Sequence, residues 1–296
     1  MKRTYVSKLH INGTYYLIGA VLLLLGVPLY QLLILIPQGY SDAIASTDKG
    51  LFTSYLSWLG NHPVQFLGYR VILLLAFAIL ITLPFTLFRI IIAQELLGRE
   101  EEDHIKSSEN TVHEETPLEA ESAESSDNID HEETELSPPE DGMPDDAWRG
   151  KGFAVLAAWS GFLGILFYVL GTFASSIYLA ITINGFTIHS TTPSNFSALS
   201  STFTIIANTV GGGLLALACL FFGAIIARSG RNLWPGMWVA FGYVAVATGA
   251  LLSGSAVGVV STPVEGQAAL TTPAILLFAL WVLWFAIMLL RLKPEL

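Results

Sequence analysis

The sequence predicts an all-α integral membrane protein, with six transmembrane helices in a 2+4 arrangement and a long disordered acidic cytoplasmic linker. Hydrophobic residues make up 53% of the 296 residues, charged residues only 13%, and the mean hydropathy is +0.59. Soluble domains carry about 25% charged residues. The stretch 98–148 holds 19 of the 24 Asp and Glu residues but two of the 14 Lys and Arg residues. We therefore divide the chain into membrane block 1 (1–98), the linker (99–148) and membrane block 2 (149–296).

Block 1 contains two apolar runs, at about 15–36 and 69–97, each long enough for a span, which needs about 20 residues. The pattern Ala43-Ile44-Ala45, with small residues at its first and third positions, would suit signal-peptide cleavage, but signal cores run only about 7–15 residues, so we expect a retained helix. Between the spans, apolar residues recur at helical spacing over 51–59. This short helix could lie at the outer membrane surface or cap the other spans.

The linker lacks the apolar periodicity that a folded core requires. Its few apolar residues are isolated between charges and hydroxyls. Low hydrophobicity with high net charge is typical of disordered segments. We therefore expect residues 99–148 to be disordered.

Block 2 contains four apolar runs, at about 152–183, 203–227, 236–260 and 273–290. Glycine, alanine and serine recur at steps of three and four along the first three, which predicts close helix packing. The last run is bulky instead, so we expect it to lie at the periphery of the bundle. The triplet at 211–213 indicates either close packing or a broken helix that lines a substrate site.

The distribution of basic residues predicts the orientation. With the N-terminus inside, twelve of the 14 Lys and Arg residues fall on the inner side, and only Lys49 and Arg70 fall outside. Positive residues favour the cytoplasmic side, so we expect both termini and the linker in the cytoplasm, with the protein in the plasma membrane. Arg89 could be a functional intramembrane charge, but a long side chain this near the helix end can reach the surface. The residues expected to anchor the inner surface are Arg89, Arg228, Arg231 and Trp234.

The spans of block 2 offer little chemistry. No charged residue occurs between Lys151 and Arg228, and only Glu265 occurs between Arg231 and Arg291. Charges within spans mark proton relays and ion coupling, so an ion-coupled transporter is disfavoured. The sequence shows no catalytic motif, haem-ligand set or metal-ligand spacing. We expect no enzymatic activity, no cofactor and no metal.

The leading hypothesis is a non-enzymatic accessory or scaffolding subunit of a membrane assembly. Its expected partners are membrane lipid and, through 99–148, other membrane subunits or basic cytoplasmic proteins, but no nucleic acid. The alternative is a passive transporter or channel for a neutral or apolar solute. A membrane enzyme acting on lipid is a third hypothesis, disfavoured because no nucleophile accompanies the inner-face charges. Candidate residues for the polar lining of a bundle cavity are Asn208, Thr172, Ser175, Ser176 and Ser253.

Overall fold

A computed structural model describes residues 3–48, 52–94, 145–189, 192–261 and 264–292. Within these ranges the chain is helical and contains no strand. Six of the described helices are long and apolar enough to cross a membrane: Ser7–Gln38, Pro63–Gln94, Gly152–Thr187, Phe196–Ser229, Gly236–Ser261 and Leu270–Arg291. This confirms the all-helical class and the expected number of spans. Residues 99–144 of the linker lie outside the described residues, so their disorder stays a prediction. For residues 145–148 the expectation is wrong, because the helix that carries the third span already begins at Asp145.

Several spans are built from more than one helical segment. The first comprises α1 (Arg3–Val21), a π-helical turn (Leu22–Gly26), α2 (Val27–Tyr30), a second π-helical turn (Gln31–Leu35) and a 3-10 turn (Ile36–Gln38). The short helices α3 (Tyr40–Asp48) and α4 (Phe52–Asn61) follow. The second span comprises α5 (Pro63–Ile79), a 3-10 turn (Leu80–Thr82) and a helix over 83–94. The others are α7 (Asp145–His189), α8 (Phe196–Thr204) with the π-helical segment Ile205–Gly211 and α9 (Gly212–Leu233), α10 (Gly236–Ser261) and α11 (Val264–Arg291).

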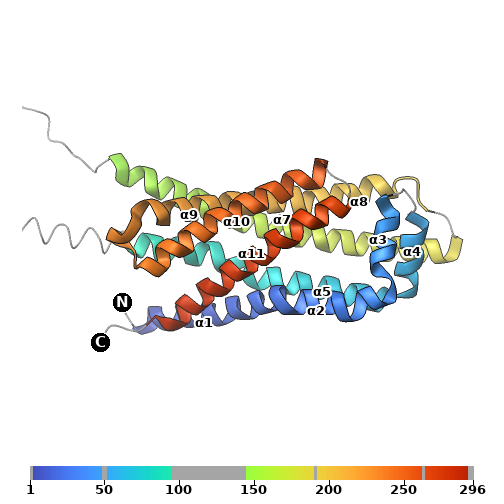
Figure 1. The fold of residues 1–296 in the computed structure, drawn as a ribbon, viewed down its shortest axis with the longest axis horizontal. Helices are drawn as coiled ribbons and strands as arrows, with labels where there is room; N and C mark the ends of the chain where they lie inside the picture. Colours follow the sequence, from blue (N-terminus) through green and yellow to red (C-terminus); the bar gives the residue numbers. More distant parts are fainter. Residues whose placement is uncertain (1–2, 49–51, 95–144, 190–191, 262–263, 293–296) are drawn as a thin grey trace, which may run out of the picture.

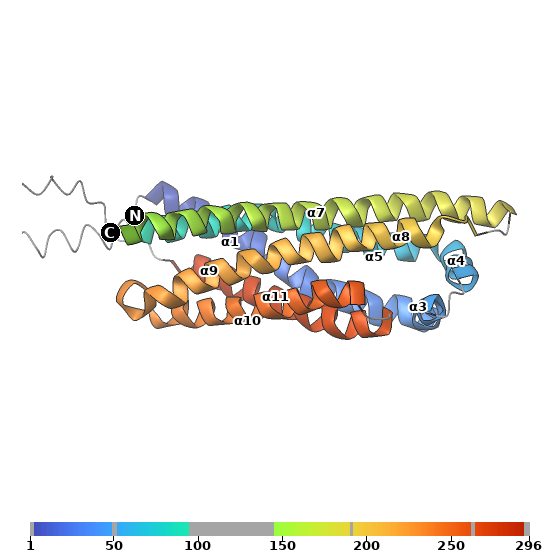
Figure 2. The same ribbon diagram turned by 90° about the horizontal axis from the view of Figure 1, so that it is seen from above.

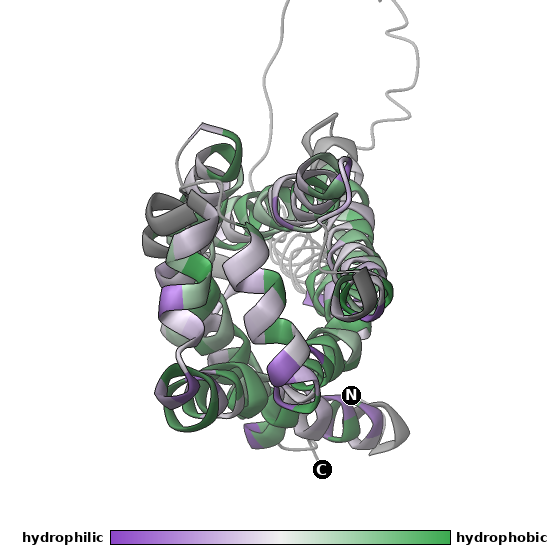
Figure 3. Cartoon of the chain, turned by 90° about the vertical axis from the view of Figure 1, so that its right-hand side faces the viewer, coloured by the Kyte–Doolittle hydropathy of each residue, from purple (hydrophilic) through white to green (hydrophobic). Residues whose placement is uncertain are grey.

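The spans lie along one axis as an elongated bundle (Figure 1). The described chain begins and ends at one end of this bundle, which we call the termini end, and α3 and α4 lie across the other, the cap end. Figure 2 shows α7 running the length of the bundle. Its 45 residues correspond to about 68 Å at 1.5 Å per residue. Seen from the cap end, α3 and α4 carry the paler and purple, more polar stretches in front of mostly apolar spans (Figure 3).

The two sequence blocks pack as one bundle. In block 1, α1 lies against α11, where a Cβ on Gly13 would be only 3.0 Å from the Leu289 Cβ. The second span lies against α7, where a Cβ on Gly161 would be 2.9 Å from the Pro84 Cγ. Close approach of helices through small residues therefore joins the blocks as well as the helices within block 2.

The last span is central, and the expectation that it lies at the periphery is wrong. Phe278, Trp281 and Phe285 of α11 are at most 1% exposed. The Trp281 ring stacks on Phe241 of α10, with 5.0 Å between ring centroids and 10° between planes. Bulky aromatic rings fill the space between α1 and α10, where a helix of small residues would leave a void. In this span, large aromatic side chains therefore indicate the core of the bundle and not its periphery.

The small residues of block 2 do bring helix backbones together. A Cβ added to Gly211 would lie 2.8 Å from the Tyr168 backbone N of α7, and one added to Gly164 would lie 2.7 Å from the Leu215 backbone N. Gly212, by contrast, has nothing within 4 Å of such an atom. The chain stays helical through 211–213 and changes from π-helix to α-helix after Gly211, so the helix is not broken at the triplet.

A polar cluster fastens α1 to the second span. The Tyr16 hydroxyl lies 2.6 Å from the Thr86 Oγ1 and 3.0 Å from the Thr82 Oγ1. The Asn12 amide also donates to the Thr86 Oγ1, at 3.2 Å. Tyr16 is fully buried. Hydrogen bonding thus supplements packing in holding these helices together.

Candidate solute-binding cavity

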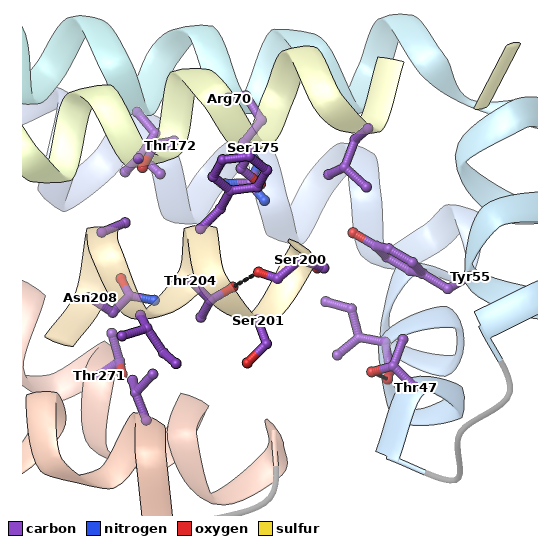
Figure 4. A pocket seen from close by; sticks show the side chains of 18 of the residues that line it. Thr47, Tyr55, Arg70, Thr172, Ser175, Ser200, Ser201, Thr204, Asn208 and Thr271 are labelled. Atoms are coloured by element: carbon purple, nitrogen blue, oxygen red, sulfur yellow. Dashed lines mark hydrogen bonds between the residues drawn. The ribbon is translucent and has the colours of Figure 1, made fainter. Parts of the chain in front are cut away.

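A cavity of about 540 Å³ with both polar and apolar walls lies between the bundle core and the cap end. On the cap side it is bounded by a second apolar cluster, the cap cluster, centred on Tyr40, Leu56, Trp58, Phe66 and Phe196. The cavity wall is formed by α3, α4, α5, α7, α8, the π-helical segment Ile205–Gly211 and the start of α11. Figure 4 shows side chains from these elements around the space.

The local sequence explains why the cap lies across the bundle. Pro37 ends the first span, and Gly39, with φ of 83°, turns the chain into α3. Pro63 then starts α5, as expected for proline in a first helical turn. The Trp58 indole N–H donates to the Gln38 carbonyl at 2.6 Å, and the Trp58 ring lies 5.0 Å from that of Tyr40. The cap is therefore packed onto the bundle, which favours the capping interpretation of α4 over a helix lying free at the membrane surface.

Hydroxyl groups line much of the cavity. Thr172 and Ser175 contribute from α7, and the serine- and threonine-rich α8 contributes along its length. The Thr204 hydroxyl donates to the Ser200 carbonyl at 2.9 Å, which leaves its oxygen lone pairs available to accept. The hydroxyl-bearing residues of the lining outside α7 are Thr47, Ser197, Ser200, Ser201, Thr204, Thr271 and Thr272, together with tyrosines of the cap and of α5.

Arg70 is the one charged side chain among the described residues that line this cavity. It lies in the first half of α5, and its guanidinium Cζ is 5.1 Å from the centroid of the Phe66 ring. The Arg70 Nε is buried and has no hydrogen-bond partner among the described residues. Figure 4 places Arg70 on the same side of the cavity as Thr172 and Ser175.

The tyrosines of the cap contribute neutral donors. Burial raises the pKa of Tyr40 above its ordinary value, although the positive charge of Arg70 opposes the shift. Burial likewise raises the pKa of Tyr55, again against the effect of Arg70. Both phenols therefore keep their protons at neutral pH, so that the positive charge of Arg70 is not cancelled by a phenolate from the cap.

Aromatic packing closes the cavity toward the termini end. A void of about 20 Å³ continues past Asn208, bounded by Phe77, Tyr168 and Phe278. The rings of Phe77 and Phe278 are stacked, with 6.2 Å between centroids and 4° between planes, and the Tyr168 ring lies 4.1 Å from that of Phe77. At the cap end the rim residues Ser197 and Ser201 are exposed. The described cavity thus has exposed residues in its wall near the cap end, and aromatic rings bound it near the middle of the bundle.

Three of the five residues predicted to line a cavity do so: Asn208, Thr172 and Ser175. Ser176 instead donates to the Thr172 carbonyl at 2.7 Å and is buried beside the cavity. Ser253 donates to the Gly249 carbonyl at 2.9 Å on α10 and is not among the lining residues.

The predicted inner-surface anchors differ among themselves. Arg89 and Arg228 are exposed, on helical segments that end at the termini end, and their role as inner-surface anchors stays a prediction. Trp234 is only 5% exposed and packs on Trp238, with 5.1 Å between ring centroids, so it belongs to the apolar core. The side chain of Arg231 lies outside the described set.

Sequence reasoning missed Arg70 as a cavity residue and assigned it to the outer surface. Hydropathy placed the start of the second span at residue 69, so that Arg70 lay at the predicted end of the helix. The helix begins earlier, at Pro63, and Arg70 therefore lies within it. The run of hydroxyl residues over 197–204 was a second available signal, because it is continuous with the fourth span.

The described residues contain no group of three or more His, Cys, Asp or Glu that could hold a metal ion. Comparison with protein-family models, curated proteins and solved structures finds no match for this chain. The function is therefore inferred from the geometry of the cavity.

Proposed function

We propose that the protein is a passive membrane transporter that takes a small solute into the cavity at the cap end. The observation that carries the proposal is the cavity of about 540 Å³. This volume lies within the range of about 300–1,000 Å³ typical of small-molecule sites. Passage across the membrane would require the rings of Phe77, Tyr168 and Phe278 to separate, as alternating access around a central site requires.

The orientation in this proposal places the cap end outside the cell membrane and both termini in the cytoplasm. The start of α1 and the ends of the helix over 83–94, α9 and α11 lie at the termini end (Figure 1). These segments carry four basic residues: Lys8, Arg89, Arg228 and Arg291. Arg70 instead lies in the first half of α5, the helix that begins at the cap end. Basic residues favour the cytoplasmic side of a membrane. The solute would then enter from outside.

Cysteine labelling tests this function whatever the solute is. Ser175→Cys, in a Cys219→Ala background, places a thiol on the cavity wall, and the parent Cys219 is buried. A membrane-impermeant thiosulfonate should modify it in right-side-out vesicles and, more slowly, in inside-out vesicles. Ile177→Cys on the lipid-facing side of α7, 46% exposed, is the matched control and should resist the reagent from both sides. Modification of Ser175→Cys from one side only, or from neither, would refute transport.

An accessory or scaffolding role is the second candidate. It is favoured by the first span, of which only 17% of the apolar window is buried, against 39–50% for the other five. Such a span has a broad face for lipid or for the helix of another subunit. The acidic linker would engage basic cytoplasmic proteins. Deletion of residues 99–144 should release specific co-purifying proteins, and an unchanged set would exclude the linker from that role.

A further inference from the structure

We infer that the cavity binds an organic anion, whose carboxylate or phosphate group pairs with the guanidinium of Arg70. The inference rests on the proposed solute-binding function and specifies the class of solute. It also departs from the expectation of a neutral or apolar solute, which was based on the absence of charges from the spans of block 2. The charge comes from block 1 instead.

The first step is the isolation of Arg70. Its Nε is buried and has no hydrogen-bond partner in the described part of the chain, and the described lining of the cavity contains no carboxylate. Asp42, on the neighbouring α3, is exposed and not part of the lining. An unpaired charge within a membrane segment is costly, and such residues usually mark a ligand pathway or site. Among the described residues, the buried Nε of Arg70 therefore has no partner, and an oxyanion in the cavity would supply one.

The second step is the chemistry that surrounds it. A guanidinium offers a planar fork of donors that matches the two oxygens of a carboxylate or phosphate. The hydroxyls of Thr172 and Ser175 lie on the same side of the cavity and can donate to further oxygens. Phe66 lies against the guanidinium, at 5.1 Å from its Cζ to the ring centroid, which stabilises the cation and restricts its position.

The third step is the apolar part of the wall. Phe52, Leu179, Phe203 and Ile275 line the same cavity. The volume of about 540 Å³ exceeds what an inorganic anion fills. An oxyanion attached to a small apolar body would use both the charge and these walls.

Calorimetric titration of the full chain, in nanodiscs of phosphatidylcholine, tests the inference with benzoate as the probe and benzamide as its neutral isostere. Benzoate should bind and benzamide should bind at least tenfold more weakly. Arg70→Gln should weaken benzoate roughly tenfold to a hundredfold, because it removes charge-assisted hydrogen bonds. Arg70→Lys should retain part of the affinity, and Arg228→Gln, at an exposed arginine, should leave it unchanged.

A second measurement guards against a folding defect. Without ligand, Arg70→Gln should unfold at the same or a higher temperature than the parent, because an unpaired charge is removed. A clearly lower temperature would indicate that Arg70 is already paired within the protein and would overturn the inference. The side chains of Asp48 and Glu265 lie outside the described set. If the parent protein does not bind benzoate but the variant with Asp48→Asn and Glu265→Gln does, Arg70 is already paired with a carboxylate of the protein, and the inference is overturned.

Nanodiscs that also contain phosphatidylglycerol distinguish a soluble anion from a lipid headgroup. An unchanged benzoate affinity would identify a soluble anion, and competition would identify the lipid phosphate as the occupant of the Arg70 site. Equal binding of benzoate and benzamide, an unaffected Arg70→Gln variant, or no binding of benzoate would overturn the inference. The two-sided labelling of Ser175→Cys is independent of these results, so transport can stand where the anion assignment fails.

Discussion

Two adjacent glycines in the fourth span should respond oppositely to the same substitution. A Cβ on Gly211 would lie 2.8 Å from the Tyr168 backbone N and 3.0 Å from the Gly164 carbonyl O, whereas nothing lies within 4 Å of a Cβ on Gly212. Both contacts of Gly211 are to backbone, which cannot rotate away as a side chain can. Overpacking costs about 1–3 kcal/mol, and this contact should fall in the upper part of that range.

Gly212→Ala is the matched control. Gly212 has ordinary right-handed helical dihedrals, φ of −63° and ψ of −40°, which alanine adopts without strain. Alanine is the better helix former by up to about 1 kcal/mol, so Gly212→Ala should be neutral or stabilising. Because both variants replace a helical glycine by alanine, this gain is common to them, and they should differ by the overpacking cost alone, about 2–3 kcal/mol in the free energy of unfolding.

Equilibrium unfolding in mixed micelles, by titration with sodium dodecyl sulfate and near-UV circular dichroism, measures this difference. The reasoning would be refuted by variants of equal stability, or by Gly212→Ala being the less stable. Either result would mean that the π-helical segment Ile205–Gly211 does not set the rotation of the fourth span against α7.

Three further predictions concern single side chains. Tyr16→Phe should lower the free energy of unfolding by about 0.5–1.5 kcal/mol, because it removes hydrogen bonds to two threonine hydroxyls. Tyr15→Phe is the control and should have no effect in the same titration, because Tyr15 is 54% exposed. Trp281→Ala should cost about 3–5 kcal/mol, because Trp281 is 1% exposed; Leu280→Ala, at 51% exposure, should cost much less, and similar losses would contradict the central position of α11. Burial raises the pKa of Tyr40 above 10.0, so above about pH 10 the folded state retains a proton that the unfolded state releases. Stability should therefore fall as the pH rises through that value, and the fall should be shallower in Tyr40→Phe; an identical slope would exclude Tyr40 as a contributor.

The position of the cavity also bears on how a passive transporter could be built without charges in block 2. Its polar groups are mainly hydroxyls, which need no ion pair when the cavity is empty and can donate or accept as a solute requires. Arg70, the one charge in the described lining, lies in the first half of α5, within reach of a solute that enters at the cap end. Selectivity would then be decided at the entrance, and the stacked rings of Phe77 and Phe278 would decide passage.

Some of the candidate site could be read from sequence. Thr172, Ser175 and Asn208 were identifiable because polar groups in apolar helices tend to face other helices. Ser176 and Ser253 are also polar residues in apolar helices, but their hydroxyls donate to backbone carbonyls of their own helices. The sequence alone does not distinguish a hydroxyl that lines a cavity from one that bonds to its own helix.

The sequence by itself determined the all-helical membrane class, the six spans and the clustering of acidic residues in the segment between the second and third spans. Span length and apolar content act locally, because a lipid environment requires about 20 apolar residues and internally satisfied backbone wherever the chain crosses. Small residues at helical spacing likewise indicate close packing whatever the partner.

Only the tertiary structure decided which faces meet. The π-helical segment Ile205–Gly211 changes the helical register, so that Gly211 and not Gly212 contacts α7. The bulky residues of the last span, Trp281 among them, were expected at the periphery of the bundle, but the Trp281 ring is buried and fills space between α1 and α10. Arg70 was expected at the outer surface, but together with residues of α3 and α4 it lines a cavity. Each outcome depends on rotations and crossings among helices distant in sequence, which local composition does not specify.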